Sequence, residues 1–203
     1  PYMLASMVSK AMGQPCGQVL KSYVFEPMGI KDCVWSTDPE GNITGGWDCF
    51  MRAGDYVRLG QLILNLGSWN GEQLISREYM SEAVSELIPT LDDPGVGWCY
   101  GYGFLFWRWP DDTFGCFGAF GQLIICSPRK NLYVATTAGL SRGSQKNGMT
   151  WLTGSFVKPW RAGIWNIRGG RAGWKRWNAA DLIVCGVFRT MTAELKRSAL
   201  NVW

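Results

Sequence analysis

Residues 101–138 read GYGFLFWRWPDDTFGCFGAFGQLIICSPRKNLYVATTA. Aromatic side chains alternate over residues 101–109, which is the period-two pattern of a half-buried strand. Two further apolar stretches, 113–126 and 132–138, each follow a turn rich in Pro, Asp or Asn. Three neighbouring strands joined by short turns predict an antiparallel β-meander.

The residues before this sheet change period and predict helices. The clearest helix covers residues 53–66, where apolar side chains recur on one face and Gly67 follows as a C-terminal cap. Residues 30–50 are expected to be irregular, because residues 38–42 are dense in turn formers. Apolar residues at helical spacing predict further helices over 2–12, 16–25 and 77–87, with weaker patterns over 144–158 and 191–200.

Charge is distributed unevenly along the chain. Residues 1–140 hold 9 Lys and Arg against 14 Asp and Glu, whereas residues 141–203 hold 11 against 2 and also carry 6 of the 12 tryptophans. Such a shift predicts a boundary between Gly139 and Lys158. We therefore expect one domain over residues 1–158 and a basic, Trp-rich tail of unknown role over residues 159–203.

Two absences limit the chemistry. The chain has no histidine, which excludes a Ser-His-Asp triad, a Cys-His pair and a His-ligated metal within these residues. Its seven cysteines form no C-x-x-C pair, so zinc ribbons and thioredoxin-like sites are not expected, and we predict neither a metal nor a cofactor. The odd cysteine count and the lack of a signal peptide or apolar membrane span favour free thiols in the cytoplasm, although the compartment stays open.

Four stretches, in this order and spacing, resemble the C-terminal part of the serine β-lactamase and penicillin-binding-protein-like family. Its nearest branch is the class C β-lactamase-related esterases and amidohydrolases. The stretches are YMLASMVSKAMG (2–13), VFEPMGI (24–30), GGWDCFMRAGDYVRLGQLILNLGSWNGEQLI (45–75) and the strand region 100–134. The resemblance implies a partial β-lactamase/transpeptidase-like α/β (α+β) fold, an antiparallel meander packed with helices. The first strands and the nucleophile helix of that fold would be missing.

The resemblance also implies a reaction, which is acyl transfer at a serine. In that family a Ser-x-x-Lys supplies nucleophile and base, a Tyr-x-Asn assists proton transfer, and a strand motif lines the opposite wall. Two backbone N–H groups form the oxyanion hole, one of them just after the strand motif's glycine. The full-length parent would therefore act on a small ester or amide through an acyl-serine.

The family's strand motif falls on Cys116-Phe117-Gly118, with Ala119 as the backbone oxyanion donor. Cys116 and Phe117 would then contact substrate, and Gly118 would let a ligand carbonyl approach the strand. Cys116 replaces the family's Lys or His, and Phe117 replaces a small or hydroxylated residue, so no cation is left to hold a carboxylate. An apolar ester or amide substrate, or an inactive member, fits better than a cephalosporinase. Alternatively, the glycines only accommodate a bulge or the adjacent phenylalanines.

The nucleophile is the part of the machinery that the sequence does not supply. Ser-x-x-Lys occurs at Ser127–Lys130 and Ser155–Lys158, but neither lies at a suitable helix start, and no Tyr-x-Asn is present. We expect the chain to be an N-terminally truncated fragment that is inactive alone. The missing strands would leave an open sheet edge, so self-association is also expected.

Other charged and aromatic groups have simpler explanations. Asp55 suits the dipole of its helix, and the pairs Asp92-Asp93 and Asp111-Asp112 lie in turns. The aromatic run 100–109 is mostly sheet packing, although part of it could line an acyl pocket. In the tail, Arg and Lys interleave with Trp, so the alternative function is a non-catalytic module whose residues 159–203 bind nucleic acid or an anionic membrane surface.

Overall fold

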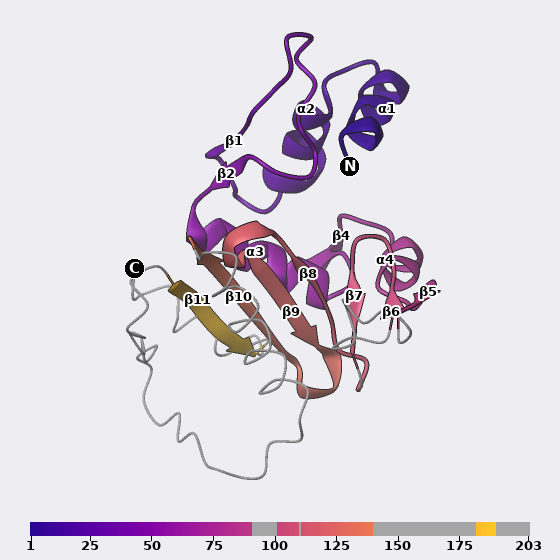
Figure 1. Ribbon diagram of the computed structural model, residues 1–203, viewed down its shortest axis with the longest axis vertical. Coiled ribbons are helices and arrows are strands. Elements are labelled where there is room, and N and C mark those ends of the chain that lie inside the picture. The colour runs from indigo at the N-terminus through magenta and orange to yellow at the C-terminus, as the bar shows by residue number, and fades with distance from the viewer. Residues whose placement is uncertain (91–100, 110, 140–181, 190–203) are drawn as a thin grey trace. The chain divides into compact units, whose positions relative to one another are not determined.

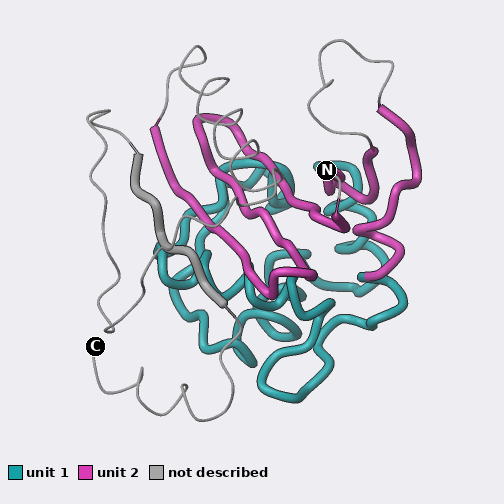
Figure 2. The backbone as a smooth tube through the Cα atoms, turned by 90° about the horizontal axis from the view of Figure 1, so that it is seen from below, with its two compact units in different colours: residues 1–80 teal, residues 81–203 magenta. Residues whose placement is uncertain are grey.

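A computed structural model describes residues 1–90, 101–109, 111–139 and 182–189 of the chain. The chain divides into two compact units, residues 1–80 and 81–203 (Figure 2). Each unit is described by itself below. Among the described residues, no helix combines the length and the apolar character needed to cross a lipid bilayer.

The helices of the first unit begin close to where the sequence predicts them. Helix α1 covers Tyr2–Met12 and ends at Gly13, whose φ of 64° is the left-handed conformation that glycine adopts without strain. Helix α2 covers Cys16–Leu20 and continues as the π-helix η1, Lys21–Phe25, so only the first half of the expected 16–25 helix is α-helical. The remaining helices are α3, Ala53–Leu64, and α4, Arg77–Ala83, which ends four residues early and spans the division between the units (Figure 1).

Residues 30–50 contain a ladder that the sequence analysis missed. Strand β1, Cys33–Trp35, pairs antiparallel with β2, Cys49–Met51. A second short hairpin joins β3, Ser68–Trp69, to β4, Glu72–Gln73, through an Asn-Gly turn. The expectation of a wholly irregular segment is therefore wrong, because three-residue strands are too short to give a periodic signal.

The core of the first unit forms beneath β1. Phe25, Met28, Ile30 and Leu62 are buried together. The rings of Phe25 and Trp35 stack with centroids 5.5 Å apart and an interplanar angle of 11°. This cluster joins the helical segment 16–30 to the ladder and to α3, and burial of its apolar surface is what stabilises the unit.

Asp38 gives the first unit a predictable response to acid. Its carboxylate accepts hydrogen bonds from the Tyr2 hydroxyl and from Asn42, and these lower its pKa from 3.8 to about 2. Since the folded-state pKa is depressed, ionised Asp38 stabilises the fold above about pH 4, and this contribution is lost as the pH falls to about 2. We expect the thermal unfolding midpoint to fall less steeply across this window in Tyr2→Phe than in the wild type. Equal slopes would contradict this role for the hydroxyl.

The second unit is built on one antiparallel sheet with strand order β11-β10-β9-β8-β7-β6-β5 (Figure 1). On one of its faces Leu123, Ile125 and Val134 form a buried cluster. The strands are β5, Ile88–Pro89; β6, Gly101–Tyr102; β7, Trp107–Arg108; β8, Phe114–Phe117; β9, Leu123–Ser127; β10, Leu132–Ala138; and β11, Leu182–Arg189.

The antiparallel meander is confirmed, but two of its expected strands are hairpins. Residues 101–109 fold back on themselves, since β6 pairs with β7 and Leu105 takes a φ of 64° between them. Residues 113–126 likewise divide into β8 and β9, which pair with each other. In both cases the alternation of apolar residues continues through the turn. A prediction based on this period alone therefore treats the two strands as one.

Strand β11 lies within the expected tail and pairs with β10 along the whole length of β10. Strand β10 is therefore an interior strand, and the outer strands of the sheet are β11 and β5. The sequence analysis missed β11, although the run LIVCGVFR is apolar and rich in β-branched residues. The domain boundary at residue 158 and self-association through an open edge stay predictions.

Removing the tail should therefore increase self-association. A chain ending at residue 158 lacks β11, which leaves one side of β10 with unpaired N–H and C=O groups. We expect this chain to elute as larger species in size-exclusion chromatography with light scattering. A chain ending at residue 189 keeps β11 and is the matched control. If both truncated chains gave the same mass, pairing by β11 would not be protecting the edge.

Candidate functional site

The candidate site lies where β8 ends and the chain turns into β9. Gly118 is still extended, with φ −103° and ψ 171°, and Ala119–Gly121 then form a single 3-10 turn. Within this turn Phe120 adopts a φ of 62°, which is uncommon for a residue with a side chain, and its ring is 54% exposed. Backbone in this region at a non-glycine residue is held in place by its surroundings.

Contacts with β9 and β10 hold the turn. The Gly118 N–H donates to the Gln122 carbonyl at 2.6 Å, and the Thr136 hydroxyl donates to the Gly121 carbonyl at 2.8 Å. The side-chain amide of Gln122 forms two hydrogen bonds with the backbone of Ala138, donating to its carbonyl and accepting from its N–H. These bonds fix the turn to a strand inside the sheet, so its backbone groups are pre-organised.

The need for glycine at position 118 has a local cause. A Cβ atom on Gly118 would lie 3.0 Å from Cβ of Gln122 and 3.4 Å from its carbonyl oxygen. Because Gln122 is anchored to Ala138, it has little freedom to move away. This contact gives the glycine a packing role against Gln122, and not against the phenylalanines that the sequence alternative named. It is compatible with close approach of a ligand as well.

Ala119 presents a backbone donor to solvent. The residue is exposed and begins the 3-10 turn, so its N–H precedes the first hydrogen bond of that turn. Within the described part of the chain, no group accepts a hydrogen bond from it. An exposed N–H on a braced turn can bind a carbonyl oxygen or an oxyanion.

Cys116 and Phe117 point to opposite faces of the sheet, as successive strand residues must. The Phe117 ring meets Trp109 edge-to-face at 5.3 Å and packs on the cluster of Leu123, Ile125 and Val134. Cys116 lies opposite Ile124, on the other face. A ligand on one side of the sheet can therefore contact only one of these two side chains.

The chemistry of Cys116 is that of a neutral thiol. Desolvation raises the pKa of this thiol to about 11, so it is protonated at neutral pH. It cannot replace the charge of a lysine. With an aromatic ring next to it at position 117, this end of β8 offers a ligand apolar surface and backbone hydrogen bonds.

Strand β8 pairs over different lengths with its two neighbours among the described strands. Strand β7 pairs with β8 only at Phe114 and Gly115. In the described residues, Cys116 and Phe117 pair only with β9. The described ladder between β7 and β8 therefore ends at Gly115, just before the candidate site.

The one Ser-x-x-Lys sequence within the described residues, Ser127–Lys130, is not in the position of a nucleophile. Ser127 is the last residue of β9, is 0% exposed and receives a hydrogen bond from the Thr113 hydroxyl at 3.5 Å. Lys130 lies in the short 3-10 turn that follows. Ser155 and Lys158 lie outside the described residues.

The carboxylates singled out in the sequence are engaged in ion pairs. Asp111 and Asp112 form a turn whose side chains pair with Arg129 at 3.4 and 3.2 Å, and Arg108 also approaches Asp112. Asp55, buried in the first turn of α3, pairs with Arg58 at 2.6 Å. Asp92 and Asp93 lie outside the described residues. Among the described residues, no group of three metal-ligating side chains comes together.

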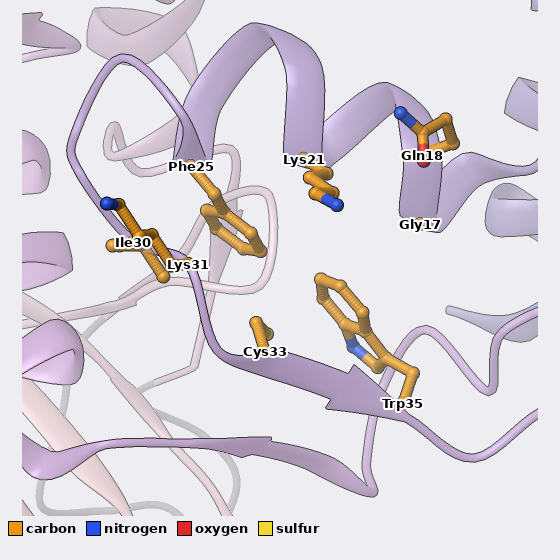
Figure 3. A pocket seen from close by; sticks show the side chains of 8 residues that line it. All are labelled: Gly17, Gln18, Lys21, Phe25, Ile30, Lys31, Cys33 and Trp35. Carbon is orange, nitrogen blue, oxygen red and sulfur yellow. The ribbon is translucent and has the colours of Figure 1, made fainter.

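A cavity that the sequence did not indicate lies within the first unit. It measures about 210 Å³, and its lining includes the stacked rings of Phe25 and Trp35, the residues Lys21 and Lys31, and Cys33 (Figure 3). All of its residues come from the segment 17–35, which joins α2 and η1 to β1. No serine lines it, so it is not a candidate for acyl transfer.

Comparisons with solved structures place the fold. A protein described as a 6-aminohexanoate-dimer hydrolase from Bacillus anthracis matches 76% of this chain at 18% identity with a TM-score of 0.60. A β-lactamase from Mycobacterium bovis matches 76% of this chain at 20% identity with a TM-score of 0.59. A β-lactamase from Bacteroides dorei matches 64% of this chain at 17% identity with a TM-score of 0.50. The chain spans 42%, 59% and 44% of these three proteins.

Comparisons of sequence match this chain to a protein family but to no individual curated protein. No curated protein matches the sequence of this chain significantly. The beta-lactamase family model matches residues 2–151, which is well over half of the chain. The resemblance seen in the sequence and the partial fold are therefore both confirmed, and this protein belongs to the beta-lactamase family.

Proposed function

We propose that this chain supplies one wall and one backbone amide donor of a serine hydrolase site that acts on an ester or amide through an acyl-serine. The observation that carries the proposal is the exposed Ala119 N–H, held on a turn that is braced by Gln122 and Thr136. A donor in this setting stabilises the oxyanion of a tetrahedral intermediate. Gly118 would let the substrate carbonyl approach.

The substrate class follows from the side chains beside that donor. Cys116 is neutral and Phe117 is aromatic, so neither can pair with a carboxylate. A small ester or amide with an uncharged, apolar acyl group fits this surface better than an anionic cephalosporin. The tight packing of Phe117 on Trp109 fixes the ring, which limits how far an acyl chain can extend on that face.

The nucleophile, in this proposal, is contributed by residues outside the chain. Ser127 cannot serve because it is fully buried, and no Tyr-x-Asn occurs in the sequence. Without the serine and its base, only residual effects of binding and oxyanion stabilisation would remain. The 203-residue chain alone should therefore not form an acyl-enzyme.

A labelling experiment tests this assignment. We expect no burst with nitrocefin or p-nitrophenyl acetate and no stoichiometric labelling by a fluorophosphonate. A longer protein that joins these residues to an upstream Ser-x-x-Lys should be labelled at that serine. Labelling of a serine within residues 1–203 would refute the proposal.

The alternative function is a binding module that uses residues 159–203. Of this segment the structure describes only the backbone of β11, so the interleaved Arg and Trp residues lie outside the described part. Binding to single-stranded nucleic acid or to anionic vesicles that weakens with salt and is lost on deleting residues 159–203 would support it.

A further inference from the structure

Two cysteines on paired strands, Cys33 on β1 and Cys49 on β2, bring their sulfur atoms close together. The Sγ atoms of Cys33 and Cys49 lie 3.4 Å apart, although 16 positions separate the residues in sequence. The ladder brings them together as diagonal neighbours on one face, since Cys33 lies opposite Met51 and Cys49 lies opposite Trp35. Both residues are accessible, since Cys33 is half-buried at the rim of a cavity and Cys49 is exposed.

We propose that Cys33 and Cys49 are a redox modification site that forms a reversible intramolecular disulfide in response to small disulfides such as oxidised glutathione. Neither residue belongs to the proposed hydrolase site, so the inference stands independently of that function. The two sulfur atoms are 3.4 Å apart and must approach to about 2.05 Å to bond, and the presence of a second sulfur within reach sets this pair apart from a lone cysteine.

The exchange balances without a further reagent. The thiolate of one cysteine attacks oxidised glutathione, forms a mixed disulfide and releases one glutathione thiolate. The second cysteine then loses its proton and attacks the protein sulfur of the mixed disulfide. The protein S–S bond forms, the bond to glutathione breaks and a second glutathione leaves. In total two protein thiols are oxidised and one glutathione disulfide is reduced to two thiols.

The surroundings of the two thiols make the first attack on oxidised glutathione slow and the closure of the protein disulfide fast. Burial raises the pKa of the Cys33 thiol, and desolvation followed by the nearby Cys33 sulfur raises that of Cys49 to about 12. Both are therefore protonated at neutral pH, and the first attack is slow. Once one sulfur is activated, the other is already within 3.4 Å, so closure is intramolecular.

The cavity beside Cys33 explains why an anionic disulfide can reach it. Lys21 and Lys31 line this cavity, and Figure 3 shows their chains around the same opening as Cys33 and Trp35. Among the described cysteines, Cys16 and Cys126 are buried and so are less open to the reagent. The site thus combines access, positive charge and a partner sulfur.

The sequence makes the test direct. Trypsin cuts after Lys31 and Arg52, and the peptide 32–52 contains Cys33 and Cys49 and no other cysteine. The full chain is equilibrated with oxidised glutathione, alkylated and digested. We expect peptide 32–52 to lose two hydrogen atoms and resist alkylation, in roughly tenfold excess over any other cysteine pair. Cleavage after Glu40 should leave its halves joined until reduction.

Two variants separate the outcomes. In Cys49→Ser the disulfide cannot form, so Cys33 should stay as a mixed disulfide with glutathione. Cys16→Ser removes a buried thiol of the same unit and should leave the 33–49 disulfide unchanged. A wild-type chain in which Cys33 or Cys49 carries glutathione without closing to the other would overturn the proposal, as would recovery of both as free thiols.

Discussion

Replacing Ala119 by proline should lower kcat/KM about 10²–10³-fold in a protein that joins these residues to the nucleophile. Proline has no N–H, so the substitution removes the proposed oxyanion donor. The turn itself should remain, because its hydrogen bonds come from Gly118, Gln122 and Thr136. The measurement is steady-state hydrolysis of p-nitrophenyl acetate by the two proteins.

The backbone at this position accepts proline. Ala119 opens a 3-10 turn, where φ is near the value that the proline ring imposes. Gly118 before it is extended, with ψ 171°, as the residue preceding proline prefers. Ala119→Ser keeps the N–H and is the matched control, expected to stay close to wild-type activity. A proline variant as active as the serine variant would remove Ala119 from the mechanism.

Local signals in the sequence predicted the helices because those signals act over a few residues. Helix α1 starts and ends at the predicted residues, since Gly13 and Pro15 stop it. The π-helical second half of the 16–25 segment carries no comparable signal, because it depends on which backbone carbonyl each N–H reaches. A hydrophobic pattern cannot distinguish the hydrogen bonding of an α-helix from that of a π-helix.

Strands that depend on distant partners were harder to predict. Strand β11 lies more than 40 residues from β10, its partner, and sits in a segment whose charge suggested a separate tail. The contact between Cys33 and Cys49 has the same origin, since it exists only when β1 and β2 pair. In each case the information lies in the pairing and not in either segment alone.

The assignment of the candidate site stays a prediction, but strand geometry gives part of its arrangement. The motif placed Cys116, Phe117, Gly118 and Ala119 together, and the structure puts them at the end of one strand. That Cys116 and Phe117 face opposite sides follows from strand geometry once the strand is accepted. The anchoring of the turn by Gln122 needs the position of β10, which local sequence does not give.

Replacing Ile125 by alanine should lower the free energy of unfolding by about 2–5 kcal/mol. Ile125 is 0% exposed in the middle of β9, between Gly115 on β8 and Val134 on β10. Removing its outer atoms leaves a cavity that the paired backbones on both sides cannot close, because their register is fixed by hydrogen bonds. Urea unfolding followed by tryptophan fluorescence measures the loss.

Two companion substitutions decide whether packing is the cause. Ile125→Val removes a single methylene group and should cost only about 0.5–1.5 kcal/mol. Ile88→Ala removes the same atoms as Ile125→Ala from a side chain that is 60% exposed on β5, so the unfolding free energy should change by no more than about 0.5 kcal/mol. If Ile88→Ala were as damaging as Ile125→Ala, the burial assigned to the centre of this sheet would be wrong. A graded order of Ala, Val and wild type at position 125, with position 88 near wild type, is what a close-packed interior requires.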